Sequence, residues 1–308
     1  MFEVTEKILN SKLDQHQKWL DGEEEGYRIV LTGVSIKGYD FKGHNLSKGT
    51  FLECEFDGCT FSEANLEEVT FESSKLTDCN FRNNGSNLVS FEGSTLVSCD
   101  FMGSVLTNTR FESSTFENCD FYKSDLNRIS FEASTLIGHD FSGCDLRGAN
   151  FNSTKLTDAN FTGAQLKLAS FVTANCANAN FTDAIVYKTN FMKSDLTNAN
   201  LTNISVDATV GNGAEIKSLQ AGGRYITWTS DYVWVDCVKA PIKPFLAFKP
   251  SNPDPLLEVI DTNSERIQSE RGYNYKEALS KDTMEWVENY IAPTIAFIKK
   301  NLATKTPQ

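Results

Sequence analysis

The chain has 308 residues and a formal net charge of −12, which leaves ample length for a large hydrophobic core and for two or three parts. The acidic balance disfavours direct, unaided binding to nucleic acid or to an acidic membrane surface. The sequence has no apolar run of about eighteen residues and no basic-then-apolar signal at its amino terminus, so we expect a cytoplasmic protein without a membrane span.

The first predicted element is an amphipathic helix over residues 2–20, with Thr5 as its N-cap. Its apolar side chains recur at helical spacing, which places Leu9 and Leu13 on one face. We interpret residues 1–26 as an N-terminal helical cap for the segment that comes next, because that segment has an open strand edge to cover.

From Leu31 to Val206 an apolar residue recurs at every fifth position over 36 consecutive places, and only Ser86 among them is polar. A second, mostly small residue stands two places before each of these central positions, and the place between them is mostly Asp, Asn, Ser or Thr. A period of five fits neither a helix nor a simple strand, so each unit must bury its apolar side chains against neighbouring units. Residues 27–212 are therefore predicted to form a solenoid.

Phenylalanine within the repeat has a longer period of twenty, and its two columns lie ten residues apart. One column is Phe41, Phe61, Phe81, Phe101, Phe121, Phe141, Phe161 and Phe181, and the other is Phe51, Phe71, Phe91, Phe111, Phe131, Phe151, Phe171 and Phe191. The columns between them are mainly leucine. This predicts a four-sided coil with aromatic stacks on opposite faces of a narrow core. About nine coils at a spacing of ~4.8 Å would make a rod roughly 43 Å long.

The five-residue pattern resembles the pentapeptide-repeat family: a small residue, Asp or Asn, then Leu or Phe, then two variable residues, as in Ala159-Asn160-Phe161. The resemblance covers roughly 180 of the 308 residues. It implies a mainly β fold, a right-handed quadrilateral β-helix. Members of this family include DNA-mimicking proteins that bind DNA gyrase, so the resemblance makes that role available here. The stretch His16–Leu20 ahead of the repeats is also similar to the opening of phage-encoded members.

Six cysteines fall on the small inward position of the repeat, and Cys176 falls on a central one. The six are Cys54, Cys59, Cys79, Cys99, Cys119 and Cys144. Thiols stacked at ~4.8 Å along one wall, with His139 next in the column, neither converge on a tetrahedral metal centre nor meet the separation of a disulfide. We interpret these cysteines as small core residues, and His44 as a core histidine. We predict no metal, no cofactor and no catalytic residue.

One stretch inside the repeat, Asn83–Asn87, breaks the pattern because Ser86 replaces a leucine and Leu88 is out of register. Asn and Gly tolerate turn conformations that other residues avoid. We expect a bulge or a small outward loop here, with the register regained at Phe91.

Residues 213–308 lack the repeat and are predicted to be a small α+β C-terminal module. Alternation over residues 224–229 and 232–238 predicts a β-hairpin. A proline-rich loop follows, and a capping signature at Asp282 predicts a last helix with a kink at Pro293. The module can serve as the second cap, and a role in partner binding is left open.

The excess negative charge lies on the repeat and its N-terminal cap, since residues 1–26 carry −4, residues 27–212 carry −8 and residues 213–308 are balanced. Outward carboxylates form two ladders at twenty-residue spacing, which we place on adjoining faces. They are Glu72, Glu92, Glu112 and Glu132 in one ladder, and Asp100, Asp120 and Asp140 in the other. Repeats copied by duplication, with outward acids retained for solubility, would give the same ladders.

The sequence shows no Ser-His-Asp order, HExxH motif, P-loop or CxxC motif, so we predict a non-enzymatic binding protein. The favoured hypothesis is that the acidic rod mimics DNA and inhibits or protects a DNA-handling enzyme, such as a topoisomerase, nuclease or defence enzyme, through the two ladders. The alternative is an interaction scaffold, in which the rod is a spacer and residues 213–308 hold the protein partner. Oligomerisation is compatible with both.

Overall fold

The computed structural model describes residues 1–85, 87–204, 209–212, 216–221, 224–229, 232–235, 238–242 and 295. The chain divides into two compact units, Met1–Ser205 and Val206–Gln308. Within the described ranges, no helix has both the length and the apolar character needed to cross a bilayer. The domain boundaries expected after residues 26 and 212 stay predictions.

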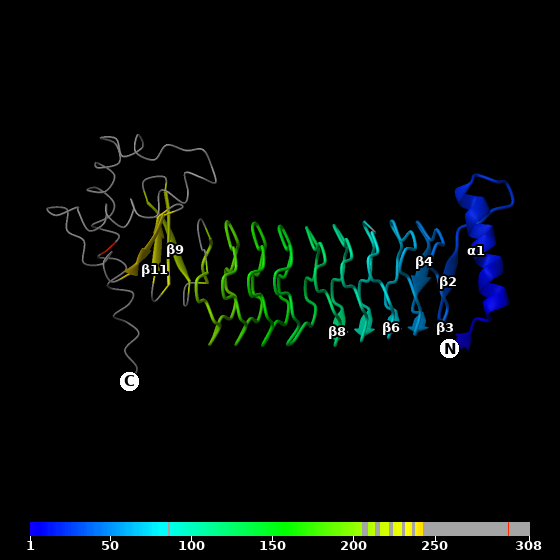
Figure 1. Ribbon diagram of the computed structural model, residues 1–308, viewed down its shortest axis with the longest axis horizontal. Helices are drawn as coiled ribbons and strands as arrows, with labels where there is room; N and C mark the ends of the chain where they lie inside the picture. The colour runs from blue at the N-terminus through cyan, green and yellow to red at the C-terminus, as the bar shows by residue number, and fades with distance from the viewer. Residues whose placement is uncertain are drawn as a thin grey trace. The chain divides into compact units, whose positions relative to one another are not determined.

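The first unit is a stack of coils whose short strands pair in parallel (Figure 1). On one side, β2 (Val30–Thr32) pairs with β4 (Thr50–Leu52). On another side the pairing runs through β3 (Val34–Lys37), β5 (Glu55–Asp57), β6 (Lys75–Thr77), β7 (Thr95–Val97) and β8 (Thr115–Glu117). Each paired residue lies twenty positions from its partner, which is the predicted length of one coil.

Four ladders of backbone pairs run along the stack and define four faces. The first face carries nine residues at twenty-residue spacing, which are Val30, Thr50, Thr70, Ser90, Arg110, Ser130, Asn150, Ser170 and Asn190. The second face contains β3 and β5–β8, the third face contains the Asp100 ladder, and the fourth contains the pair Val105 and Asp125. The predicted mainly β solenoid of about nine coils is confirmed.

Phenylalanine fills the core as predicted. Within a column the rings stack, as Phe61 and Phe81 do at a centroid distance of 4.7 Å and an interplanar angle of 6°. Across the core the two columns meet edge to face, as Phe81 and Phe91 do at 5.7 Å and 84°. These rings are at most 1% exposed. The third and first faces are therefore opposite walls of one aromatic core.

The residue two places after each central residue has a left-handed backbone, a feature that the sequence analysis did not predict. Glycine occupies some of these positions, but twenty-five of them hold another residue, such as Glu68 with φ 57° and Ala133 with φ 59°. Left-handed backbone costs a residue with a side chain roughly 1–2 kcal/mol. The ladder offsets this cost, because the N–H at the same position donates to the next coil, as Ser73 does to the Glu92 carbonyl at 2.9 Å.

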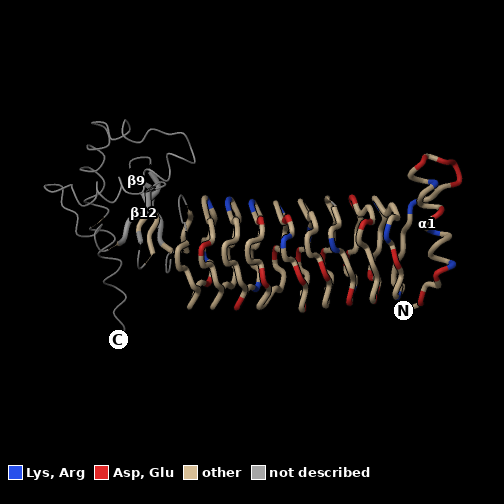
Figure 2. The backbone as a smooth tube through the Cα atoms, in the orientation of Figure 1, with Lys and Arg blue, Asp and Glu red and all other residues tan. Residues whose placement is uncertain are grey.

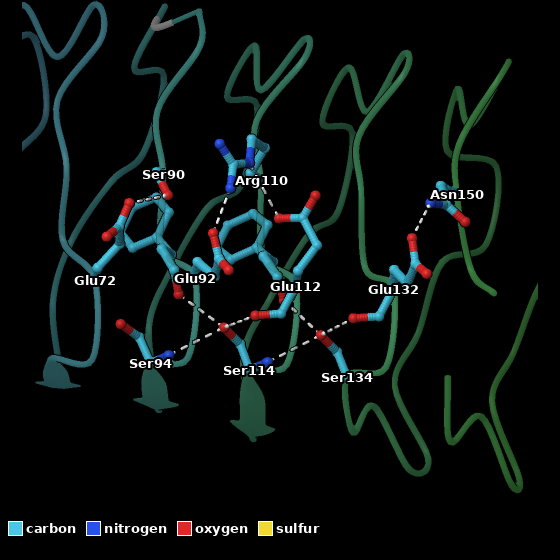
Figure 3. Close-up of polar contacts among 12 residues, drawn as sticks. Glu72, Ser90, Glu92, Ser94, Arg110, Glu112, Ser114, Glu132, Ser134 and Asn150 are labelled. Carbon is cyan, nitrogen blue, oxygen red and sulfur yellow. Dashed lines mark hydrogen bonds and ion pairs between the residues drawn. The ribbon is translucent and has the colours of Figure 1, made fainter. Parts of the chain in front are cut away.

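Polar side chains at the small inward position are satisfied by the backbone. Ser74, Ser94, Ser114 and Ser134 share one column (Figure 3). The Ser114 hydroxyl donates to the Phe91 carbonyl at 2.7 Å and accepts the Ser94 N–H at 3.2 Å. Because the buried hydroxyl both donates and accepts a hydrogen bond, these bonds replace the ones that it would make with water and offset the cost of burying it.

The amino terminus covers the first coil with a strand and a helix. β1 (Phe2–Glu3) adds to β3 in parallel, and α1 spans Glu6–Leu20. The helix predicted from residue 2 is therefore wrong at its start, because the first residues pair with the open strand edge instead. Thr5 is the N-cap residue by position, but its side chain makes no capping hydrogen bond. Leu9 and Leu13 are buried, as expected for one face of the helix.

His16 links α1 to the first coil. It is fully buried, and its Nδ1 accepts the Ile29 N–H at 3.2 Å, so the ring must be unprotonated at that nitrogen. Burial lowers the pKa of His16 below its usual 6.5, and the backbone of Leu46 and Ser47 offsets this shift in part.

We expect the free energy of unfolding to fall as the pH drops below 6.5, because the unfolded chain then binds a proton that the folded His16 resists. The loss should continue until the pH reaches the lowered pKa of the folded state. Urea unfolding at a series of pH values measures it. His16→Gln, whose side-chain oxygen can still accept the Ile29 N–H, should remove this part of the pH dependence. An identical profile in that variant would contradict the assignment.

The expected bulge at Asn83–Asn87 is not found in the described residues that flank Ser86. Gly85 pairs with Val105 and Ser90 pairs with Arg110, so no residue is inserted between these pairs. Asn84 instead fills the small inward position and donates through Nδ2 to the carbonyls of Phe61 and Ala64, at 2.8 and 2.9 Å. The asparagine thereby supplies hydrogen bonds inside the regular coil. Ser86 itself lies outside the described residues.

The second unit contains an antiparallel sheet in the order β12-β11-β10-β9. The strands are β9 (Lys217–Ala221), β10 (Arg224–Trp228), β11 (Tyr232–Val235) and β12 (Val238–Pro241). The predicted hairpin is confirmed, with buried Trp228 opposite buried Val233. The outer strands β9 and β12 were not predicted. Pro241, the first proline of the proline-rich segment, ends β12 and is not part of a loop, and the segment beyond Ile242 lies outside the described residues. Of the helix expected from Asp282, only Ile295 is described; it is helical and buried, and the kink expected at Pro293 lies outside the described residues.

Candidate partner-binding surface

The glutamate ladder lies in the turns that follow the first face, one residue per coil (Figure 3). Its members are not free carboxylates. Arg110 bridges Glu92 and Glu112, Glu72 accepts the Ser90 hydroxyl at 3.1 Å, and Glu132 accepts the Asn150 amide at 2.9 Å. The guanidinium offsets the repulsion between the two middle acids, although an exposed pair of this kind contributes only about 0–1 kcal/mol.

The aspartate ladder has a conformational role in the turns of the third face. Asp100, Asp120 and Asp140 each accept the N–H two residues further on, at 2.9, 2.8 and 2.9 Å respectively. Asn80 and Asn160 do the same at equivalent positions. Such turns need an Asp or Asn oxygen and no charge. The turn hydrogen bond is therefore independent of charge, although Asp100 also forms an ion pair with Arg82 at 2.6 Å.

The two ladders are not on adjoining faces as expected. The glutamates follow the face of Phe111, and the aspartates lie on the face of Phe101. The two rings meet edge to face at 5.9 Å across the core, so their faces are opposite. Ten residues separate the two columns, which is half of a coil of twenty. A single flat partner surface cannot therefore lie against both ladders.

The acidic residues are not spread evenly along the first unit (Figure 2). Residues 1–120 carry 21 acids and 10 bases, whereas residues 121–212 carry 8 acids and 7 bases. The densest stretch is residues 51–80, in which Lys75 is the single base. Its acids are Glu53, Glu55, Asp57, Glu63, Glu67, Glu68, Glu72 and Asp78, and we call this set the acidic belt.

The acidic belt carries more charge per length than duplex DNA. Thirty residues make one and a half coils, which is about 7 Å of rod. DNA carries one charge per ~1.7 Å, or about four over that length. The belt has a net charge of −7 there, since its eight acids face one base. Each of its acids is exposed or half-buried. The belt, which wraps several faces, therefore reaches the charge density that the rod as a whole lacks.

A concave site lies between α1 and the first coil. This cleft of about 650 Å³ is lined by residues that include Glu6, Asn10, Asp14, Tyr39, Asp40 and His44. The Tyr39 hydroxyl donates to Asn10 Oδ1 at 2.5 Å. Burial, with the carboxylates of Glu6 and Asp14, raises the pKa of Tyr39. His44 lines this cleft and is only partly buried, so it is not the core histidine that was expected.

The seven cysteines of the first unit are unpaired thiols, and all except Cys119 are buried. Burial raises the pKa of Cys144 to about 12, which keeps that thiol protonated and inert. Over the part of the chain that the structure describes, no group of three or more His, Cys, Asp or Glu residues could hold a metal ion.

The sequence matches two descriptions of one protein family. "Pentapeptide repeats (8 copies)" matches residues 45–83 and 87–121, and "Pentapeptide repeat region" matches residues 139–209. No curated protein matches the chain significantly.

Several solved structures are similar to the chain. QnrB1, a plasmid-mediated fluoroquinolone resistance protein, is 14% identical, with 55% of this chain and 92% of that chain covered and a TM-score of 0.42. HetL from the cyanobacterium Nostoc sp. strain PCC 7120 is 22% identical, with 64% and 94% covered and a TM-score of 0.27. Rfr23 from the cyanobacterium Cyanothece 51142 is 21% identical, with 44% and 90% covered and a TM-score of 0.22. With its matched repeats and its four-faced coil, the chain belongs to the pentapeptide-repeat family.

Proposed function

We propose that the protein is a non-enzymatic, cytoplasmic binding protein whose acidic half takes the place of a nucleic-acid duplex on the basic surface of a DNA-handling enzyme, such as a topoisomerase, nuclease or defence enzyme. Pentapeptide-repeat proteins are generally binding or structural proteins without catalytic activity. The observation that carries the proposal is the acidic belt, with its net charge of −7 over residues 51–80. A rigid backbone ladder holds these acids in place, so little conformational entropy is lost when a partner binds.

The ladder acids are the second part of the proposed surface. They extend the negative potential from the belt as far as Asp140, on opposite sides of the rod. A partner that wraps around the rod can contact both sides, as proteins that encircle DNA do. A partner with one flat surface would use the belt and one ladder.

The test compares two variants with the same change in charge. In the ladder variant, Glu72, Glu92, Glu112 and Glu132 become Gln, and Asp100, Asp120 and Asp140 become Asn. In the belt variant, Glu53, Glu55, Glu63, Glu67 and Glu68 become Gln, and Asp57 and Asp78 become Asn. Each variant removes seven charges, and Asn retains the turn hydrogen bond that Asp100 makes to the Met102 N–H. Both should therefore keep the fold, which circular dichroism and thermal unfolding can check.

The wild-type chain is used to capture proteins from a bacterial lysate, with and without excess competitor DNA. We expect a DNA-handling enzyme to be retained and then displaced by DNA. The belt variant should weaken its binding at least tenfold, because the opposite-charge contacts that steer and hold a basic surface are lost. Loss in the ladder variant alone would move the site to the ladders. Equal binding by all three proteins would contradict mimicry.

The second candidate function is the scaffold, in which residues 213–308 hold the partner. The observation that favours it is the compact second unit, whose four-stranded sheet is more than a cap requires. In that case a partner retained in the same experiment would ignore competitor DNA and would bind both charge variants as well as the wild type.

A further inference from the structure

The turns that follow the fourth face, one in each coil, are sorted by charge along the first unit. They form a line that we call the fourth-face line, made of residues 67–68, 87–88, 107–108, 127–128, 147–148, 167–168 and 187–188. The line begins with two acids and passes through two uncharged turns, and each of its last four turns carries one base: Arg128, Arg147, Lys167 and Lys188. Figure 2 shows bases along the upper edge of the coils farthest from α1. One end of the line is therefore acidic and the other is basic.

The charges at the two ends of the line are not neutralised within the chain. Glu67 and Glu68 are exposed, as are Lys167 and Lys188. None of the four forms an ion pair with a described residue. The ammonium groups of both lysines lie over the Tyr187 ring, at 5.3 and 5.2 Å from its centroid, so two positive charges are held at one place. Each end can therefore contact charges of the opposite sign on another molecule.

Exposed apolar side chains gather on the same side of the rod. Leu88 and Leu168 belong to the line, and they are 51% and 57% exposed. Val105 and Ile185, on the fourth face itself, are 44% and 40% exposed, and each lies seventeen residues after one of the leucines. Of the seven exposed large apolar side chains in the described part of residues 31–204, these are four, a larger share than an even spread over four faces would give. Apolar side chains that gather on one surface mark an interaction site.

The order of the line is complementary to its own reverse. A second chain can lie against it in the opposite direction, with turn 127–128 of one chain on turn 127–128 of the other. Each position then meets the same position in another turn, so Glu68 meets Lys188 and Leu88 meets Leu168. Arg128 alone meets its own copy, and for an exposed pair this costs little. The opposite direction also keeps the two acidic halves apart, whereas parallel chains would bring them together.

We propose that the fourth-face line is the interface of an antiparallel homodimer, in which a two-fold axis through turn 127–128 relates the chain to a second copy. Such a contact is isologous, so both ends make the same ion pairs and the assembly closes at two chains. The seven turns span about 29 Å, and a strip about 10 Å wide covers ~300 Å² per chain, less than the roughly 800 Å² per partner of a stable interface. The dimer is therefore weak, and salt weakens it further because its ion pairs are exposed.

The test exchanges the charges at the two ends of the line. The acid variant combines Glu67→Lys with Glu68→Lys, and the base variant combines Lys167→Glu with Lys188→Glu. Sedimentation velocity of the intact wild-type chain at low salt should show a reversible monomer–dimer equilibrium. Each variant alone should associate at least about tenfold more weakly, because attraction at both ends becomes repulsion. An equimolar mixture of the two variants should recover the wild-type association, because acids again meet bases at both ends.

The matched control combines Lys155→Glu with Lys193→Glu, which reverses two exposed lysines on other sides of the rod. This variant should associate as the wild type does. A wild-type chain that stays monomeric at every concentration, association that neither end variant weakens, or a mixture that associates no better than its components would overturn the proposal. Circular dichroism confirms that every variant is folded. The test needs no partner enzyme, so its result is independent of the proposed function.

The antiparallel register is tested by cross-linking. When Leu88→Cys chains and Leu168→Cys chains are mixed under mild oxidation, a disulfide-linked dimer with one chain of each kind should form, because these positions meet. Either variant alone should cross-link no more than the parent chain, whose own cysteines set the background, since each position lies about 19 Å from its own copy. Cross-linking of each variant with itself, at the level of the mixture, would contradict this register.

Discussion

Phe111→Ala is expected to lower the free energy of unfolding by about 3–5 kcal/mol, the range found when a buried phenylalanine is truncated. Phe111 is fully buried and stacks on Phe91 at 4.7 Å and on Phe131 at 5.4 Å. It also meets Phe116 edge to face at 5.1 Å. The backbone ladder fixes the distance between coils, so the neighbouring rings cannot collapse into the cavity. Denaturant unfolding followed by circular dichroism measures the loss.

Phe116→Leu is the matched control for this prediction. The second face holds leucine at the equivalent position one coil earlier and one coil later, at Leu96 and Leu136. The loss should therefore stay below about 1.5 kcal/mol, as for other hydrophobic exchanges of similar size. Since solenoids lose stability locally, Phe111→Ala should also broaden the unfolding transition. Equal losses in the two variants would mean that the aromatic stacks have no special role.

The second large effect is expected at the N-terminal cap. Introducing Leu9→Asp together with Leu13→Asp should detach α1 from the first coil and cause the chains to associate. Leu9 is 1% exposed and Leu13 is 5% exposed, so each new carboxylate would have to be buried at a cost of several kcal/mol. Release of the helix would uncover the apolar end of the solenoid. Size-exclusion chromatography with light scattering measures the association.

The fluorescence of Trp19 reports the same event independently, because its ring stacks on His16 at 5.5 Å and His16 would lose its hydrogen bond from the Ile29 N–H and become exposed to water. Ile8→Asp is the control, since Ile8 lies on the same helix but is 41% exposed. It should leave the chain in its wild-type oligomeric state with unchanged Trp19 emission. If the double variant behaves like this control, α1 is not needed to keep the end of the solenoid covered.

The repeat could be predicted closely because its burial is strictly periodic. Every coil presents the same inward positions to the same environment, so Phe61 and Phe81 occupy equivalent places and the columns follow from spacing alone. Features without a period were missed. β1 has two residues, too few for any pattern, and pairs with β3 only because an open edge is present. The left-handed turns were missed because most of them contain no glycine.

The acidic residues of the candidate surface could be predicted from the sequence. The side chains that bind them could not, because those contacts depend on distances between coils. The sequence nevertheless contains a pattern that predicts these side-chain contacts. Contacts at an offset of eighteen residues recur along one side, between Ser90 and Glu72, between Arg110 and Glu92 and between Asn150 and Glu132. The adjoining-face assignment failed for a simpler reason, since ten residues are half of a coil and place two columns on opposite walls.

The twenty-residue register of the backbone also restricts how such a chain can change in length during evolution. Gain or loss of one whole coil returns every later residue to its own column, so Phe meets Phe and Leu meets Leu. A change of five residues keeps inward residues inward, but it rotates the rest of the chain by a quarter turn and brings phenylalanines into leucine columns. Any change that is not a multiple of five turns core residues toward solvent. Viable relatives should therefore differ by complete coils, and the rod should grow or shrink in equal steps.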